Sequence, residues 1–170
     1  MAIKDALLPE FDHEMGTTRR LLERLPEDKL SWQPHPKSWN LGQLASHLVN
    51  IPLWSQTILN ESSFDLASRD ESPEAQQSRT VSSRQHALQL LDENVARTRA
   101  SLASKSDAEL LAIWTLTRAG QEIMTVPRIA AFRSFVLNHL IHHRGQFSVY
   151  LRMNNVPLPP IYGPTADEAF

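Results

Sequence analysis

The sequence has no cysteine among its 170 residues. This absence excludes a disulfide framework, a CxxC redox pair, a thiolate zinc knuckle and a cysteine nucleophile. If the chain carries out metal chemistry, imidazole and carboxylate groups must supply the ligands, and the sequence offers seven histidines for this role. Any sulfur atom that takes part in a reaction must therefore arrive with another molecule.

The sequence also lacks an excess of charge of one sign. Lysine and arginine number 17 and aspartate and glutamate number 19, which gives a net charge of −2. A protein whose main task is to grip a polyanion needs a concentrated positive surface, so we expect no nucleic-acid partner. The four tryptophans have no basic stripe beside them, and we expect them to anchor the core rather than to stack on bases.

Long apolar runs and several catalytic signatures are absent as well. No stretch reaches the ~18 apolar residues of a membrane helix, and the first residues have no apolar segment typical of a secretory signal. We therefore expect a cytoplasmic protein with no membrane partner. The sequence has no glycine-rich phosphate loop, no GxSxG elbow and no HExxH motif. A single ExxH motif, Glu10 to His13, falls short of the two that ferritin-like bundles use.

Apolar residues recur every three or four positions in four segments, which predicts four amphipathic helices. Pro26 ends the first, and Asn40 with Gln43 forms a capping box at the start of the second. Pro52 predicts a kink within the second helix, and Ser82 is expected to cap the third. The predicted helices span about residues 5–25, 40–59, 82–102 and 127–154 or 127–155.

The connections between these helices differ in character. Residues 61–79 are polar and predict a long surface loop. Ser106 and Glu109 form a second capping box in a short turn, and the loosely alternating segments 113–117 and 122–126 predict a small β-hairpin. Residues 156–164 predict an irregular tail. The expected fold is all-α: one four-helix-bundle domain over residues 1–170 with a long crossover connection.

Two histidines of the last predicted helix share one face. At about 100° per residue, His139 and His143 lie only ~40° apart. Phe132, Val136 and Phe147 point in nearly the same direction, which predicts that both imidazoles face into the bundle. His142 falls about 80° to one side. A pair of histidines at i and i+4 can bind one metal ion.

A metal site of this kind needs a third ligand. His47, on the second predicted helix, and His13, near the edge of the apolar stripe on the first, are the two candidates. The competing interpretation is that these histidines are core residues hydrogen-bonded to carbonyl or hydroxyl groups.

Three segments of the sequence resemble the DinB-like superfamily of metal-binding four-helix bundles, which includes YfiT-type hydrolases and bacterial thiol transferases. Residues 38–48 read SWNLGQLASHL and are similar to the family's segment entering its second helix. Residues 139–146 read HLIHHRGQ and match its HxxHHRGQ signature. Residues 162–168 read YGPTADE and resemble its YGPSADE tail.

This resemblance implies three metal ligands, His47, His139 and His143, with His142 outside the first coordination sphere. It implies a divalent ion, with Zn²⁺ or Ni²⁺ favoured over Fe²⁺ or Mn²⁺, and a homodimer. Some relatives resemble enzymes that join a low-molecular-weight thiol to an electrophile. Many others are known only as metal-binding, stress-associated bundles.

Three functions are therefore compatible with the sequence. The first is a metal-dependent enzyme that activates a thiol co-substrate for attack on a small electrophile. The second uses the same site for hydrolysis, and the third is a non-catalytic bundle that the metal stabilises.

Further residues of the last predicted helix are candidates for positioning a ligand. Asn138, His142 and Gln146 are expected close to the metal or the substrate. Arg144 is expected to pair with Asp167 or Glu168 or to bind a carboxylate of the thiol, the alternative being a solvated surface charge.

Overall fold

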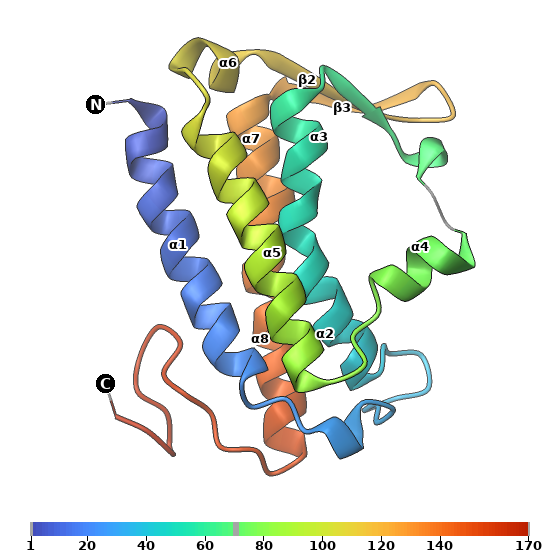
Figure 1. The fold of residues 1–170 in the computed structure, drawn as a ribbon, viewed down its shortest axis with the longest axis vertical. Helices are drawn as coiled ribbons and strands as arrows, with labels where there is room; N and C mark the ends of the chain where they lie inside the picture. Colours follow the sequence, from blue (N-terminus) through green and yellow to red (C-terminus); the bar gives the residue numbers. More distant parts are fainter. Residues whose placement is uncertain (1, 70–71, 170) are drawn as a thin grey trace.

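A computed structural model describes residues 2–69 and 72–169 and has four helical columns packed into a bundle (Figure 1). The second column is interrupted at Pro52 by the 3₁₀ turn η2, where the sequence predicts a kink. The first helix begins and ends a few residues earlier than predicted, and it continues through Pro9. The columns are α1 (Ile3–Leu22), α2 (Leu41–Asn50) with η2 (Ile51–Leu53) and α3 (Trp54–Asn60), α5 (Arg84–Ala103), and α7 (Arg128–Phe132) with α8 (His139–Met153).

The order of the columns follows from their contacts. Helix α1 packs against α5 and α8, and α2 packs against the same two helices, so α1 and α2 occupy opposite corners of the bundle. Figure 1 shows that α2, α3 and α5 run in one direction while α1, α7 and α8 run in the other. The connection from α3 to α5 must therefore return along the length of the bundle, which is the predicted long crossover.

The crossover holds more regular structure than the predicted surface loop. It contains the strand β1 (Ser63–Asp65), the 3₁₀ turn η3 (Leu66–Ser68) and the helix α4 (Pro73–Ser78). The strand pairs in parallel with the hairpin near the end of the bundle, with Phe64 opposite Leu116. Strand β1 is too short to show an alternating pattern in the sequence, so its pairing could only be found in the structure.

The predicted β-hairpin is confirmed. Strands β2 (Ile113–Arg118) and β3 (Gln121–Pro127) pair antiparallel, and the order in the sheet is β1-β2-β3. The two residues of the turn, Ala119 and Gly120, have φ angles of 50° and 76°. Left-handed conformations at both positions give the turn a twist that matches the strands, and glycine adopts this conformation without strain.

Local capping sequences set several helix starts. Asn40 Oδ1 accepts from the Gln43 amide at 2.7 Å, and Gln43 Oε1 accepts from the Asn40 amide at 2.9 Å, so the predicted capping box is present. Ser106 and Glu109 form the same motif before α6 (Asp107–Leu111). Helix α5 is capped by Ser83 and not by the predicted Ser82, because it is the Ser83 hydroxyl that accepts from the His86 amide.

The last column is not one continuous α-helix. Pro127 is the final residue of β3 rather than the first residue of a helix. Residues Arg133–Asn138 form a π-helical segment, η4, between α7 and α8. The wider π turns change the direction of successive side chains, and such segments are frequent at functional sites. Asn155 takes the left-handed conformation, with φ of 58°, just after α8 ends.

The core between the columns is mainly apolar, and among the described residues it contains one buried ion pair. Arg144 on α8 and Glu14 on α1 are 1% and 6% exposed, and Arg144 Nη1 lies 2.6 Å from Glu14 Oε2. The Tyr162 hydroxyl donates to the same carboxylate oxygen at 2.9 Å, and the Tyr162 ring lies 5.0 Å from the guanidinium. No helix among the described residues is long and apolar enough to cross a membrane.

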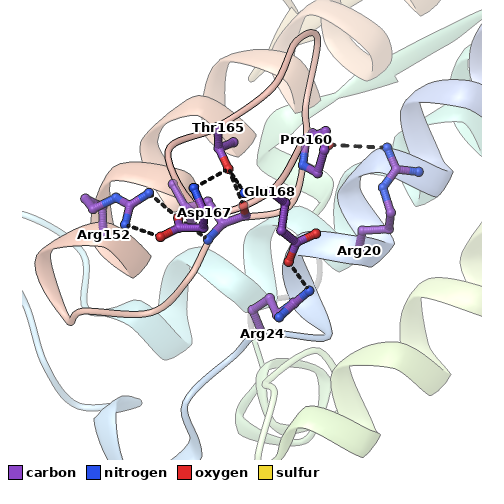
Figure 2. A network of polar contacts seen from close by, with 8 residues as sticks. Arg20, Arg24, Arg152, Pro160, Thr165, Asp167 and Glu168 are labelled. Carbon is purple, nitrogen blue, oxygen red and sulfur yellow. Dashed lines mark hydrogen bonds and ion pairs between the residues drawn. The ribbon is translucent and has the colours of Figure 1, made fainter. Parts of the chain in front are cut away.

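The expectations that Arg144 pairs with Asp167 or Glu168, or is a solvated surface charge, are therefore wrong. Other arginines take the expected partners in the C-terminal tail: Arg152 binds Asp167, and Arg24 binds Glu168 (Figure 2). These contacts hold the tail against α8 and α1. Arg144 lies on the face of α8 that packs into the core. The sequence pattern around the histidines did not predict this burial.

The buried pair predicts a large difference between two glutamates of α1. Glu14→Gln leaves the Arg144 charge without its counter-ion in the core, and we expect the free energy of unfolding to fall by about 3–5 kcal/mol. Glu10→Gln is the matched control, because Glu10 pairs at the surface with Arg133, which lies in the same helical column as Arg144. We expect that loss to be at most about 1 kcal/mol. Urea unfolding of both variants measures the difference, and equal losses would contradict this account of the core.

Candidate metal centre

Three histidines from two helices meet where α2 faces α8. His47 lies on α2, and His139 and His143 lie one turn apart at the start of α8. Each offers one ring nitrogen, and these three atoms all lie within 4.8 Å of one another. His47 Nε2 and His139 Nε2 are 2.8 Å apart, and the His143 ring centre lies 4.4 Å from that of His47. The structure thus brings together the three residues that the family resemblance selects.

Local structure fixes the direction of each helix at the cluster. The capping box of Asn40 and Gln43 fixes the first turn of α2, and Gly42 lies against the Leu30 carbonyl, where a Cβ atom would approach to 3.1 Å. On the other side, η4 ends directly before His139. The histidines are only partly buried, because the core-facing side of α8 is formed by the buried Leu140, Arg144 and Phe147. The predicted inward direction is therefore correct only in part: the imidazoles lie at the edge of the core.

A hydrogen bond from Gln146 sets the tautomer of one ligand. His143 Nδ1 lies 2.8 Å from Gln146 Oε1, and an amide oxygen can only accept, so the proton of the neutral imidazole is on Nδ1. His143 Nε2 then carries the lone pair that a metal ligand requires. The amide nitrogen of Gln146 donates to His142 Nε2 at 3.1 Å. Gln146 therefore orients His143 from outside the cluster, as ligand-orienting residues commonly do.

Two tryptophans form the aromatic surroundings of the cluster. Trp39 stacks on His143, with ring centres 5.6 Å apart, and lies 4.8 Å from the His47 ring. Trp54 approaches His139 at 4.9 Å and His47 at 5.6 Å. The expectation that all tryptophans anchor the core is wrong for Trp39, which is 46% exposed. Sequence reasoning missed its contact with the histidines, although Trp39 stands in the same family-like segment as His47.

The cluster keeps its imidazoles neutral. Burial, followed by the neighbouring imidazoles and Arg69, lowers the pKa of His47 to about 3. Burial and the charges of His143 and His142 lower the pKa of His139 to about 4, and burial lowers that of His143 as well. Among the described residues, no carboxylate joins this group of three. Neutral imidazoles have the lone pairs that bind divalent ions, and an ion does not have to compete with protonation to the imidazolium form near neutral pH.

The remaining candidates lie outside the cluster. His142 is exposed and contacts Gln146 and the His143 ring. Asn138 is exposed at the end of η4, and no hydrogen bond within the described residues joins it to the three histidines. His13 is exposed on α1, at the corner of the bundle opposite α2. Of the two candidates for a third ligand, the geometry therefore selects His47.

The donor set fits a divalent transition-metal ion. Three nitrogens that bind one tetrahedral ion at about 2.0–2.1 Å stand about 3.3 Å apart. Here one pair of nitrogens is 2.8 Å apart and all three lie within 4.8 Å of one another, so the cluster has the dimensions of such a site. Neutral imidazole suits zinc, nickel and iron and is less suited to magnesium or calcium, which prefer oxygen ligands. Three protein ligands also leave a position open for a further molecule.

Comparisons with known proteins agree with this fold. The model of the DinB family matches residues 1–169. The chain belongs to the DinB family. Among solved structures, a DinB-like protein from Bacillus cereus ATCC 10987 is 21% identical, with a TM-score of 0.69, over 95% of this chain and 98% of that chain. The DinB-like protein YjoA from Bacillus subtilis is 19% identical, with a TM-score of 0.68, over 92% and 97%.

One further relative matches by sequence. The uncharacterized protein YrdA of Bacillus subtilis strain 168 is 24% identical over 172 residues, which covers 96% of this chain and 90% of the relative. These relatives support the fold of this DinB-family protein, and their names assign neither a metal nor a reaction.

The lowered pKa values predict a pH dependence for the stability of the metal-free protein. Below pH 6.5 the histidines of the unfolded chain bind protons, whereas folded His47 and His139, with pKa values of about 3 and 4, stay neutral. The folded state then binds fewer protons, so the free energy of unfolding falls as pH drops from 6.5 towards 4. Above pH 6.5 these groups contribute no slope.

Urea unfolding in the presence of a chelator, at about pH 5 and pH 7.5, measures this slope. Replacing His47 and His139 with glutamine should flatten it. His13→Gln, which changes an exposed histidine outside the cluster, should leave it unchanged. An equal loss of stability at acid pH in the double variant and the wild type would contradict the assigned environment.

Proposed function

We propose that this DinB-family protein is a metal-dependent enzyme that joins a low-molecular-weight thiol to a small electrophile. The observation that carries the proposal is the cluster of three neutral imidazole nitrogens within 4.8 Å, in a chain without a cysteine of its own. The ion is Zn²⁺ or Ni²⁺ in preference to Fe²⁺ or Mn²⁺. His47, His139 and His143 are its ligands.

His47, His139 and His143 would hold the ion, which would supply the Lewis acidity that favours the thiolate form of a bound thiol at neutral pH. The sulfur lone pair then forms the new C–S bond, the leaving group departs with the electron pair of its own bond, and the thiol proton passes to solvent. A water molecule in place of the thiol would give a hydrolase, which is the alternative that the assay below separates.

The protein's residues would provide orientation and shielding. Gln146 accepts a hydrogen bond from His143 Nδ1, which leaves the lone pair on His143 Nε2 for the ion. Trp39 and Trp54 cover two sides of the cluster with aromatic rings, which limits access of water. A less hydrated site strengthens the interaction between a cation and a thiolate.

We place the proposed reaction in the cytosol. Reduced low-molecular-weight thiols are maintained in the cytosol, which is the compartment that the proposal requires. The partners are a small-molecule substrate and a second copy of the chain in a homodimer, with no nucleic acid and no membrane. These partners are the ones that composition and family resemblance lead us to expect.

Metal content of single variants tests the ligand set. We expect one ion per chain in the wild type and a loss of stoichiometric metal in His47→Ala, His139→Ala and His143→Ala, because two imidazoles hold a divalent ion far more weakly than three. His142→Ala and His13→Ala are matched controls that retain the ion, since both residues are exposed and lie outside the cluster. Elemental analysis, with circular dichroism to verify folding, measures the outcome. Full metal content in His47→Ala would overturn the assignment.

Turnover tests the reaction itself. The metal-loaded protein is assayed with cysteine, glutathione and coenzyme A against 1-chloro-2,4-dinitrobenzene, with the His139→Ala protein as the control. Metal-dependent formation of the thioether supports the transferase. Hydrolysis of an ester substrate without thioether formation supports the hydrolase. A stably bound ion with neither activity would leave a metal-stabilised, non-catalytic bundle as the function.

A further inference from the structure

A cavity of about 530 Å³ opens beside the histidine cluster. His139 and Trp54 belong both to its wall and to the surroundings of the cluster, so the cavity and the proposed metal site share one boundary. Its volume lies within the range of small-molecule sites. The remaining lining residues come from α2 to α4, β2 and η4: Asn50, Leu53, Thr57, Ile58, Phe64, Leu66, Ser68, Arg69, Arg79, Trp114, Leu116 and Phe135.

The outer wall of the cavity is anchored to the hairpin. The Asp65 carboxylate accepts from the Ala119 and Gly120 amides, each at 2.9 Å, and from the Ala67 amide at 2.8 Å. These bonds fix the residues on either side of Asp65, namely Phe64 and Leu66, which face the cavity. The three backbone amides also lower the pKa of the Asp65 carboxyl, so the charged form that makes these bonds persists at neutral pH. The cavity is therefore formed before a ligand binds.

The lining has a consistent chemistry. Most of it is aromatic or branched aliphatic, the charged residues in it are Arg69 and Arg79, and no carboxylate is among the described lining residues. Trp114 is 2% exposed, and its indole N–H has no hydrogen-bond partner within the described structure. This nitrogen is itself buried, so the side of Trp114 that the cavity exposes is apolar ring surface. Such a lining favours an apolar molecule without positive charge.

We infer that this cavity binds the apolar, ring-containing body of the electrophilic substrate. The reactive carbon would then lie at the boundary formed by His139 and Trp54, next to the thiol. The identification of the ligand as a substrate rests on the proposed function, whereas its binding requires only the cavity. The enzyme therefore prefers aromatic or other ring-containing electrophiles over small, strongly hydrated electrophiles.

Binding of the neutral dye N-phenyl-1-naphthylamine tests the inference. We expect one saturable site per chain by equilibrium dialysis, and displacement of the dye by 1-chloro-2,4-dinitrobenzene. Thr57→Trp fills the cavity from α3 and Leu66→Trp fills it from the opposite wall, and each should weaken binding at least about tenfold, or about 1.4 kcal/mol. Thr125→Trp is the control, because Thr125 is exposed on β3 and does not line the cavity.

The outcomes separate this inference from the proposed function. His47→Ala should bind the dye as the wild type does while it loses the metal. Absence of saturable dye binding in the wild type, unchanged binding in both folded filling variants, or failure of the electrophile to displace the dye would overturn the inference. Intact dye binding in a wild-type protein that holds no metal or shows no thioether formation would overturn the proposed function and leave the cavity as a ligand site. Circular dichroism verifies that each variant is folded.

Discussion

The buried ion pair between Glu14 and Arg144, together with the buried Leu140 and Phe147 on the same face, fixes the rotation of α8 about its own axis. Two charges removed from water are stable only while they remain paired, so Arg144 must face α1, and the Tyr162 hydroxyl adds a third contact to the same carboxylate. Arg144 directly follows His143. Successive side chains on an α-helix differ by about 100°, so a helix that turns Arg144 towards α1 turns His143, and His139 one turn before it, towards α2. The signature HLIHHRGQ thus combines a structural arginine with two metal-ligand candidates.

The histidine cluster follows from that orientation and from the neutrality of its members. At the edge of the apolar core, the pKa values of His47 and His139 are about 3 and 4, and that of His143 is lowered, because burial and then neighbouring imidazoles disfavour the protonated forms. Such a cluster gains little from mutual hydrogen bonding, since each pair of neutral rings can share only one proton. A divalent ion uses all three lone pairs at once. The cavity shares His139 and Trp54 with the surroundings of this cluster, and under the proposed function its apolar wall would hold one reactant.

Local sequence signals predicted the parts of this structure that depend on neighbouring residues. The capping boxes, the kink at Pro52, the hairpin and the spacing of His139 and His143 all involve groups a few residues apart, and all are present. The partnership of Glu14 with Arg144 spans 130 residues, and neither residue differs locally from a surface charge. The π-helical segment and strand β1 depend on tertiary packing and have no periodic pattern. The apolar stripe favours His47 over His13 as the third ligand and family resemblance selects it, but only the bundle order, which places α2 beside α8, brings it to the other two histidines.

The central claim is that His47, His139 and His143 together hold one divalent ion. Crystals of the wild-type protein grown with Zn²⁺, measured on both sides of the zinc absorption edge, test it most directly. We expect a single strong anomalous peak per chain, about 2.0–2.1 Å from one ring nitrogen of each of the three histidines, with Gln146 still hydrogen-bonded to His143 Nδ1. The absence of a peak at this position, or a peak bound by His142 in place of any of the three, would contradict it.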